Sequence, residues 1–413
     1  MDRYNKRYTT IALFYFFVAA ALGLLLRLFP IIDVDATYRY IVHTHSHIAL
    51  IGWVYGALTV LIYQLLIEKT EKNKKKFKLL FFFTQITILG MLISFPIKGY
   101  ALFSIVFSTL FLIASYWFYV FYKKSVKIPA ISMYANKFIH ASLLFMLLSS
   151  IGPWTLGIIM NTLGSSSPWY KNAIYFYLHF QYNGWFLFCL IGLFFLLVAH
   201  LKISLSNKQL RAIYKLFTLS CFFTFFLSVL WMQPHPIIYI FAGFGAVTQA
   251  IALIKLIQIT VSIKTLLRQK LSPIIYQSLY LALVLLVLKI TLQTLSAIPF
   301  FATLASQVIS FVIAYLHLVF LGVVSLSLFA FLSFFKLIKL PTFWVYIYLN
   351  GFVSSEILII YNGIATWKQF PNIDNYFFYL VVFSALMFIG LLGILIPNLK
   401  TIFSTQKESL LQK

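Results

Sequence analysis

The stretch "IVHTHSHIALIGWVYGALTVLIYQLL", residues 41–66, joins three histidines at alternate positions to a long apolar run. The part from Ile48 to Leu66 has no charged side chain, and a run of this length can cross a bilayer as an α-helix. This stretch therefore predicts a membrane helix with imidazoles at its beginning.

Similar apolar runs fill the rest of the chain, which is 62% hydrophobic and 10% charged over 413 residues. This composition excludes a soluble domain and predicts a single all-α, polytopic transmembrane domain over residues 1–413. Twelve transmembrane helices are predicted, at about 9–30, 40–66, 77–97, 100–122, 135–161, 171–200, 211–232, 236–258, 273–297, 303–333, 340–363 and 376–397.

Basic residues gather in every second connection, for example "EKTEKNKKKFK" after span 2 and "YKKSVK" after span 4. The positive-inside rule then places both termini in the cytoplasm. The net charge of +24 is explained by this arrangement, so no nucleic-acid partner is expected. Cys189 and Cys221 fall inside apolar runs, which argues against a disulfide framework or a thiolate metal site.

Histidines recur on the predicted spans 2, 6 and 10. His47 opens "HIALIG", His179 opens "HFQYNG" and His317 opens "HLVFLG", so each has a glycine five residues later. The three histidines are 132 and 138 residues apart, which predicts three diverged four-helix units at about 1–130, 131–265 and 266–413.

Imidazole inside a membrane is costly unless it is paired or ligated, and it is a common ligand of metals and of haem iron. A hydrogen bond to another helix is the simpler explanation for any one of these histidines. The glycine in each motif removes a side chain, so that either a planar ring or another backbone can approach.

With twelve predicted spans and histidines on spans 2, 6 and 10, the chain resembles subunit I of the haem–copper oxidases and their nitric oxide reductase relatives. The resemblance implies twelve transmembrane helices in three pseudo-symmetric four-helix arcs, a low-spin b-type haem, and copper. It also implies a quinol or cytochrome electron donor, further membrane subunits, and a multi-pass protein of a bacterial inner (plasma) membrane.

Carried over by position, the resemblance gives His47 or His45 as the low-spin haem ligand on span 2 and His317 as the ligand on span 10. It gives His179 on span 6 and His235 in "LWMQPHP" as copper ligands. "HFQYNGW" is similar to the nitric oxide reductase branch, which has a glutamate where this chain has Asn183.

The chain departs from the family at two places. His235 stands alone between two prolines where the family has a histidine pair, and Tyr315 stands where the high-spin haem ligand is expected. Tyrosine can ligate haem iron, but an altered or lost high-spin haem is the simpler reading, which puts reduction of oxygen or nitric oxide in doubt.

Span 2 is also similar to the NnrS-type haem–copper membrane proteins linked to nitric oxide tolerance. Two haem hypotheses therefore stand: an oxidoreductase for electron transfer and terminal reduction of oxygen or nitric oxide, and a non-catalytic haem or copper protein for sensing or metal handling. A polytopic transporter is a third hypothesis.

Other polar residues lie inside the predicted spans. Glu356 and Lys289, with Tyr182 and Asn183, are candidates for a proton or polar path. The alternative for Glu356 is a structural role or pairing with Lys289.

The sequence leaves the span 2 ligand undecided. Residues two apart on a helix point about 200° apart, so His43, His45 and His47 cannot all face one ligand. The glycine spacing favours His47, His45 stays possible, and His43 is expected near the bilayer edge.

Overall fold

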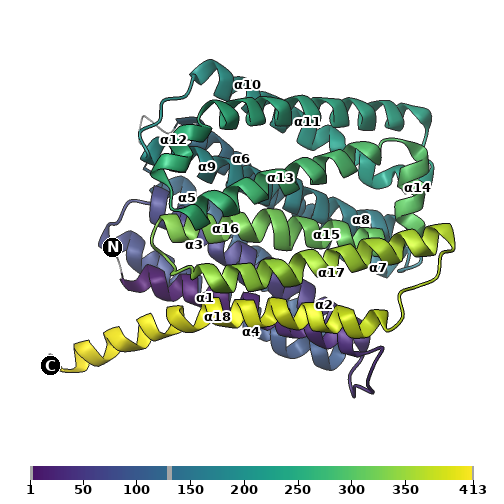
Figure 1. Cartoon of the computed structure of the whole chain (residues 1–413), viewed down its shortest axis with the longest axis horizontal. Helices are drawn as coiled ribbons and strands as arrows, with labels where there is room; N and C mark the ends of the chain where they lie inside the picture. Colours follow the sequence, from purple (N-terminus) through teal and green to yellow (C-terminus); the bar gives the residue numbers. More distant parts are fainter. Residues whose placement is uncertain (1–2, 128–132, 412–413) are drawn as a thin grey trace. The chain divides into compact units, whose positions relative to one another are not determined.

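The computed structural model describes residues 3–127 and 133–411 (Figure 1). Within these residues, twelve helical segments are long and apolar enough to cross a membrane, which confirms the predicted all-helical, multi-pass membrane fold. The spans are Asn5–Leu28, Tyr38–Leu66, Glu71–Lys98, Leu102–Ser125, Met133–Thr162, Pro168–His200, Asn207–Met232, Pro236–Ser262, Pro273–Leu295, Ile309–Phe334, Thr342–Lys368 and Tyr376–Lys400. The predicted repeat boundary near residues 130 and 131 lies outside the described residues.

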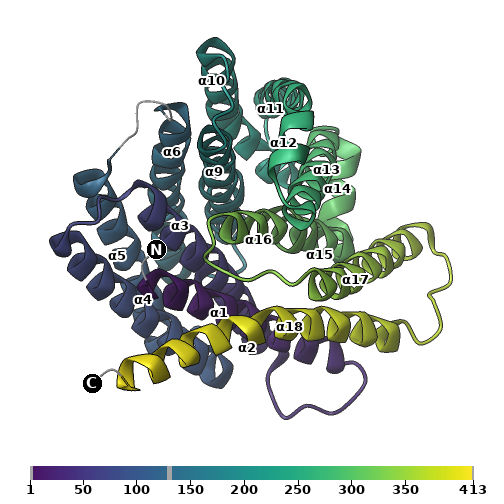
Figure 2. The same cartoon turned by 60° about the vertical axis from the view of Figure 1, so that its left-hand side comes forward.

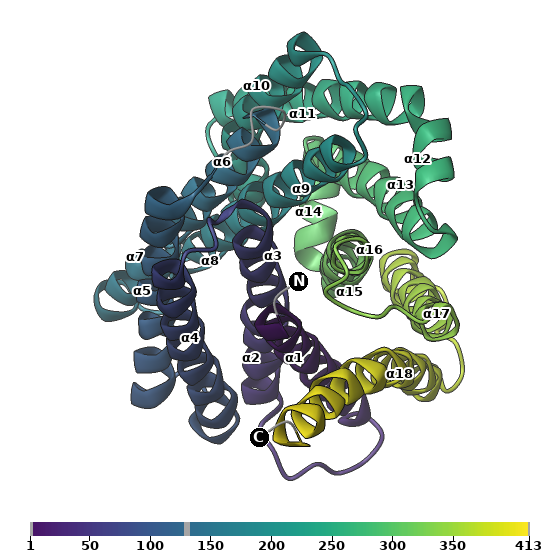
Figure 3. The ribbon, with the colours of Figure 1, turned by 90° about the vertical axis from the view of Figure 1, so that its left-hand side faces the viewer.

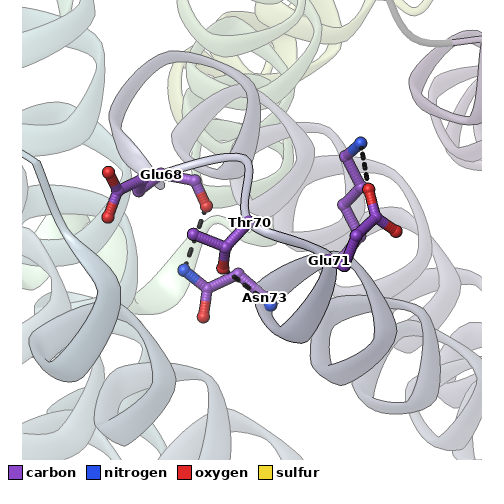
Figure 4. A network of polar contacts seen from close by, with 5 residues as sticks. Glu68, Thr70, Glu71 and Asn73 are labelled. Atoms are coloured by element: carbon purple, nitrogen blue, oxygen red, sulfur yellow. Dashed lines mark hydrogen bonds and ion pairs between the residues drawn. The ribbon is translucent and has the colours of Figure 1, made fainter.

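Span 3 begins at Glu71, six residues before its predicted start, because a capped turn precedes the apolar run. The Thr70 side chain accepts a hydrogen bond from the Asn73 backbone N–H at 3.2 Å, and the Asn73 amide donates to the Glu68 carbonyl at 3.0 Å (Figure 4). Glu71 pairs with Lys74 at 2.8 Å. An N-cap and charged helix formers extend a helix beyond its apolar part.

Span 10 begins at Ile309 rather than at 303. The residues before it form a separate helix, α14 (Pro299–Gln307), and the extended conformation of Val308 divides the two. Neither proline nor glycine marks this break, so the hydropathy pattern joined α14 to the span.

The chain divides into two compact units. The first comprises Met1–Lys127, Leu332–Ala365 and Phe370–Lys413. Its helices are α1 (Arg3–Leu28), α2 (Tyr38–His47), η1 (Ile48–Tyr55), α3 (Gly56–Leu66), α4 (Glu71–Lys98), α5 (Leu102–Ser125), most of α17 (Thr342–Lys368) and α18 (Tyr376–Leu411). In this unit α1 packs along α18, and α4 packs along α5 (Figure 3).

The second unit comprises Ile128–Phe331 and Thr366–Gln369. Its helices are α6 (Met133–Ser149), α7 (Ile151–Thr162), α8 (Pro168–His179), η3 (Phe180–Phe186), α9 (Leu187–His200), α10 (Asn207–Phe223), η4 (Thr224–Met232), α11 (Pro236–Ser262), α12 (Lys264–Lys270), α13 (Pro273–Leu295), α14, α15 (Ile309–His317), η5 (Leu318–Val324) and most of α16 (Ser325–Phe334). Here α6 packs along α9, and α10 packs along α11 (Figure 2).

Candidate functional site

Spans 2, 6 and 10 share a backbone irregularity at the histidine motif. In each span an α-helix ends at the histidine and a π-helical segment begins at the next residue. The segments are η1 after His47, η3 after His179 and η5 after His317. π-Helical turns are rare and often mark functional sites. The sequence predicted the common register of the three motifs but not this change of helix type.

Each π-helical segment packs against the helix of the preceding span: η1 on α1, η3 on α6, and η5 on α13. The glycines explain two of these contacts. A Cβ at Gly52 would lie 2.7 Å from the Cβ of Tyr15, and a Cβ at Gly184 would lie 2.6 Å from the Cβ of Phe145. Of the two predicted uses of these glycines, the structure therefore supports close helix packing over approach of a planar ring.

His45 faces α1. Its Nδ1 lies 2.8 Å from the Ala19 carbonyl oxygen, and the imidazole lies against Gly23, where an added Cβ would come within 3.1 Å of the His45 Cε1. Because a carbonyl only accepts, Nδ1 carries the proton and Nε2 carries the lone pair. A hydrogen bond of this kind orients many metal-ligating histidines.

His43 and His47 share another face of α2, toward α4 and the turn that follows it. The His47 Nδ1 donates to the His43 carbonyl at 2.8 Å, and its Nε2 lies 3.4 Å from the Tyr100 hydroxyl. The His47 ring is 4.5 Å from the ring of Phe95, and the His43 ring is 4.7 Å from that of Tyr100. The three alternating histidines therefore divide between two faces.

Lys289, in the C-terminal third of α13, lies at the centre of a buried polar network in the second unit. It is 2% exposed, and its Nζ donates to the Asn183 and Gln293 side-chain oxygens. The Tyr315 hydroxyl donates to the same Gln293 oxygen at 3.3 Å, and the Lys289 Nζ lies 5.8 Å from the centroid of the Tyr182 ring. Three of the four residues predicted for a polar path, Lys289, Asn183 and Tyr182, are therefore neighbours.

His179 belongs to this network and is 1% exposed. The Asn183 amide donates to its Nδ1 at 3.2 Å, and its Nε2 donates to the Cys221 carbonyl at 2.8 Å. Both ring nitrogens of His179 are therefore engaged in hydrogen bonds, so a copper ion at His179 would have to displace one of these partners.

His235, the other predicted copper ligand, is exposed and forms the N-cap of α11. Its Nδ1 accepts from the Ile237 N–H at 3.4 Å. Within residues 3–127 and 133–411, no group of three or more His, Cys, Asp and Glu side chains is placed to hold a metal ion.

The remaining predicted residues lie in two places. His317, half-buried, ends α15 directly before η5. Glu356 is buried in the first unit, where it interacts electrostatically with Arg27 of α1, and both interact with Tyr376 of α18. Glu356 and Lys289 thus each have polar neighbours within their own unit.

Two residues of these sites were missed from the sequence, Gln293 and Tyr100. Gln293 follows Lys289 by four residues, so helical periodicity could have found it. Tyr100 comes from a turn far from span 2 in the sequence, and no local signal pointed to it. No protein-family model and no curated protein matches this chain.

Proposed function

We propose that the chain is a haem-binding integral membrane protein with the three-arc architecture of haem–copper oxidase subunit I. One low-spin b-type haem would be held by a span 2 histidine and by His317. The observation that carries the proposal is the repeated histidine–π-helix junction at His47, His179 and His317. One such junction on the second span of each predicted four-helix repeat is consistent with three related four-helix arcs whose histidines face inward.

The contacts of span 2 favour His45 as the haem ligand over His47. The Ala19 carbonyl orients the His45 ring from a neighbouring helix and leaves its Nε2 with the lone pair. The His47 Nδ1 instead donates to the His43 carbonyl of its own helix. His45 would thus hold the haem together with His317, and a haem bound there would supply one-electron transfer.

The contacts of His179 and Tyr315, the residues at the predicted copper and high-spin haem positions, favour electron transfer or haem-based sensing over reduction of oxygen or nitric oxide. Copper at His179 would have to displace the hydrogen bond either to Asn183 or to the Cys221 carbonyl. Tyr315 is engaged with Gln293. We therefore favour the non-catalytic alternative, with a quinol or cytochrome as electron partner in a bacterial inner membrane.

Absorption spectroscopy of the purified full-length protein, reconstituted with haem in detergent, tests this proposal. We expect a sharp reduced α-band in the wild type, its loss in His45→Ala and in His317→Ala, and no carbon monoxide adduct. His235→Ala, at an exposed position, is the matched control and should keep the wild-type spectrum. Folded protein without stoichiometric haem binding would refute the proposal.

A further inference from the structure

His43 and His47 lie on one face of α2, and His45 lies on another. The helix is α-helical from Tyr38 to His47, so two residues four positions apart lie on the same side. This is the spacing by which one helix offers two imidazoles to a single metal ion. We propose that His43, His47 and the Tyr100 hydroxyl bind a divalent transition-metal ion, Zn²⁺ or Cu²⁺.

Tyr100 is held near both histidines by an ordered turn. Gly99, with φ of 59°, ends α4, and the Ser104 hydroxyl donates to the Gly99 carbonyl at 2.6 Å. The Tyr100 ring lies 4.7 Å from the His43 ring and 5.9 Å from the His47 ring. The Tyr100 ring therefore lies against both imidazoles.

The donor atoms suit a metal that prefers nitrogen ligands. The hydrogen bond from the His47 Nδ1 to the His43 carbonyl fixes Nε2 as the lone-pair atom and directs it toward Tyr100. His43 is half-buried. Tyr100 is 47% exposed, so water can complete the coordination.

The donor atoms narrow the choice of metal ion, and a nearby positive charge affects its affinity. Two imidazoles and a phenol suit Zn²⁺ and Cu²⁺, whereas Mg²⁺ and Ca²⁺ require several carboxylate or carbonyl oxygens. Arg39, one turn before His43 on the same face, interacts with His43 through its positive charge. Arg39 therefore opposes a bound cation, and its removal should strengthen binding.

A Zn²⁺ titration of the full-length protein in detergent, after removal of metals with a chelator, tests the site. With a chromophoric chelator as competitor, we expect one Zn²⁺ per chain. His43→Ala and His47→Ala should each weaken binding by about 100-fold or more, above the range of outer-shell changes. Arg39→Gln should tighten it severalfold.

Two histidine variants serve as controls. His200→Ala and His235→Ala each change an exposed imidazole of the second unit, and neither should alter Zn²⁺ affinity. Loss of binding in either one to the same extent as in His43→Ala, or the absence of any Zn²⁺ site in the wild type, would overturn the proposal.

A measurement on the unsubstituted protein guards against variants that fail to fold. Electron paramagnetic resonance of the Cu²⁺-loaded wild type should show hyperfine coupling to two imidazole nitrogens. Coupling to none would also overturn the site. The metal titration is independent of the haem spectrum, so either proposal can fail without the other.

Discussion

The buried amine of Lys289 shows how single residues are tolerated inside a membrane span. A charged or strongly polar group is costly in the hydrocarbon region unless partners within the protein satisfy it. Here two amide oxygens, from Asn183 and Gln293, accept from Lys289. Asn183 also donates to His179, so one side chain serves two buried groups at once.

Asn183→Leu should therefore destabilise the protein, since it removes one of the two hydrogen-bond partners of Lys289 and one of the two partners of His179. We expect a loss of about 1–3 kcal/mol in unfolding free energy, as for a buried polar group that loses its partner. Unfolding by sodium dodecyl sulfate in mixed micelles measures it. Asn161→Leu, at an exposed asparagine whose amide donates to the Gly157 carbonyl, should change stability by less than about 1 kcal/mol. Equal losses in the two variants would contradict the role of Asn183.

The residues of this network were predictable one by one, but their partnership was not. Lys289 and Asn183 stand out in the sequence because each is polar within an apolar run. They are 106 residues apart in the sequence. Lys289 belongs to α13 and Asn183 to η3, so only tertiary packing brings them together.

At the scale of helices, the π-helical segments and their glycines determine how neighbouring spans pack. A π-turn changes which side chains face a neighbour, and a glycine in it lets the neighbour approach closely. An added Cβ at Gly52 would meet Tyr15 of α1, and one at Gly184 would meet Phe145 of α6.

Gly184→Ala should destabilise the pair of α6 and η3, because its Cβ would come within 2.6 Å of the Phe145 Cβ. We expect a loss of about 1–3 kcal/mol, the usual effect of overpacking. Gly157→Ala is the matched control: no atom lies within 4 Å of its added Cβ, so it should be neutral or stabilising. The unfolding free energy in mixed micelles again measures both.

A double variant tests the contact itself. Phe145→Gly alone should be destabilising, but combined with Gly184→Ala its effect should be less than additive, because glycine at position 145 removes the Cβ that the new alanine would meet. If the losses in unfolding free energy of the two single variants simply add, the cost of Gly184→Ala does not come from its contact with residue 145.

For the whole molecule, the number of candidate spans agrees with the predicted twelve. Which connections lie in the cytoplasm and which lie outside stays a prediction. The basic connections predict that residues 72 and 204 lie in the cytoplasm and that residues 35 and 165 lie outside. All four positions are exposed.

Cysteine labelling checks this orientation. With a membrane-impermeant thiol reagent on intact cells, Asp35→Cys and Ser165→Cys should react. Lys72→Cys and Ser204→Cys should react only after permeabilisation. Cys189 and Cys221 are buried, so the unsubstituted chain should give little background. The opposite labelling pattern would reverse the topology, and a mixed pattern would contradict the count of spans.

The sequence by itself determined the membrane fold, the twelve spans and the register of three histidine motifs. These depend on the length of apolar runs and on residue spacing, both of which are local properties. It erred where local signals were weak, at the capped start of span 3 and at the break before span 10.

Only the tertiary structure decided what each polar group contacts. It divided "HTHSH" between two faces, with His45 toward α1 and with His43 and His47 toward Tyr100. It also engaged both ring nitrogens of His179 in hydrogen bonds with Asn183 and the Cys221 carbonyl. The physical reason is that hydrogen bonds and ligand sites depend on atoms brought together by packing, which no spacing along one helix encodes.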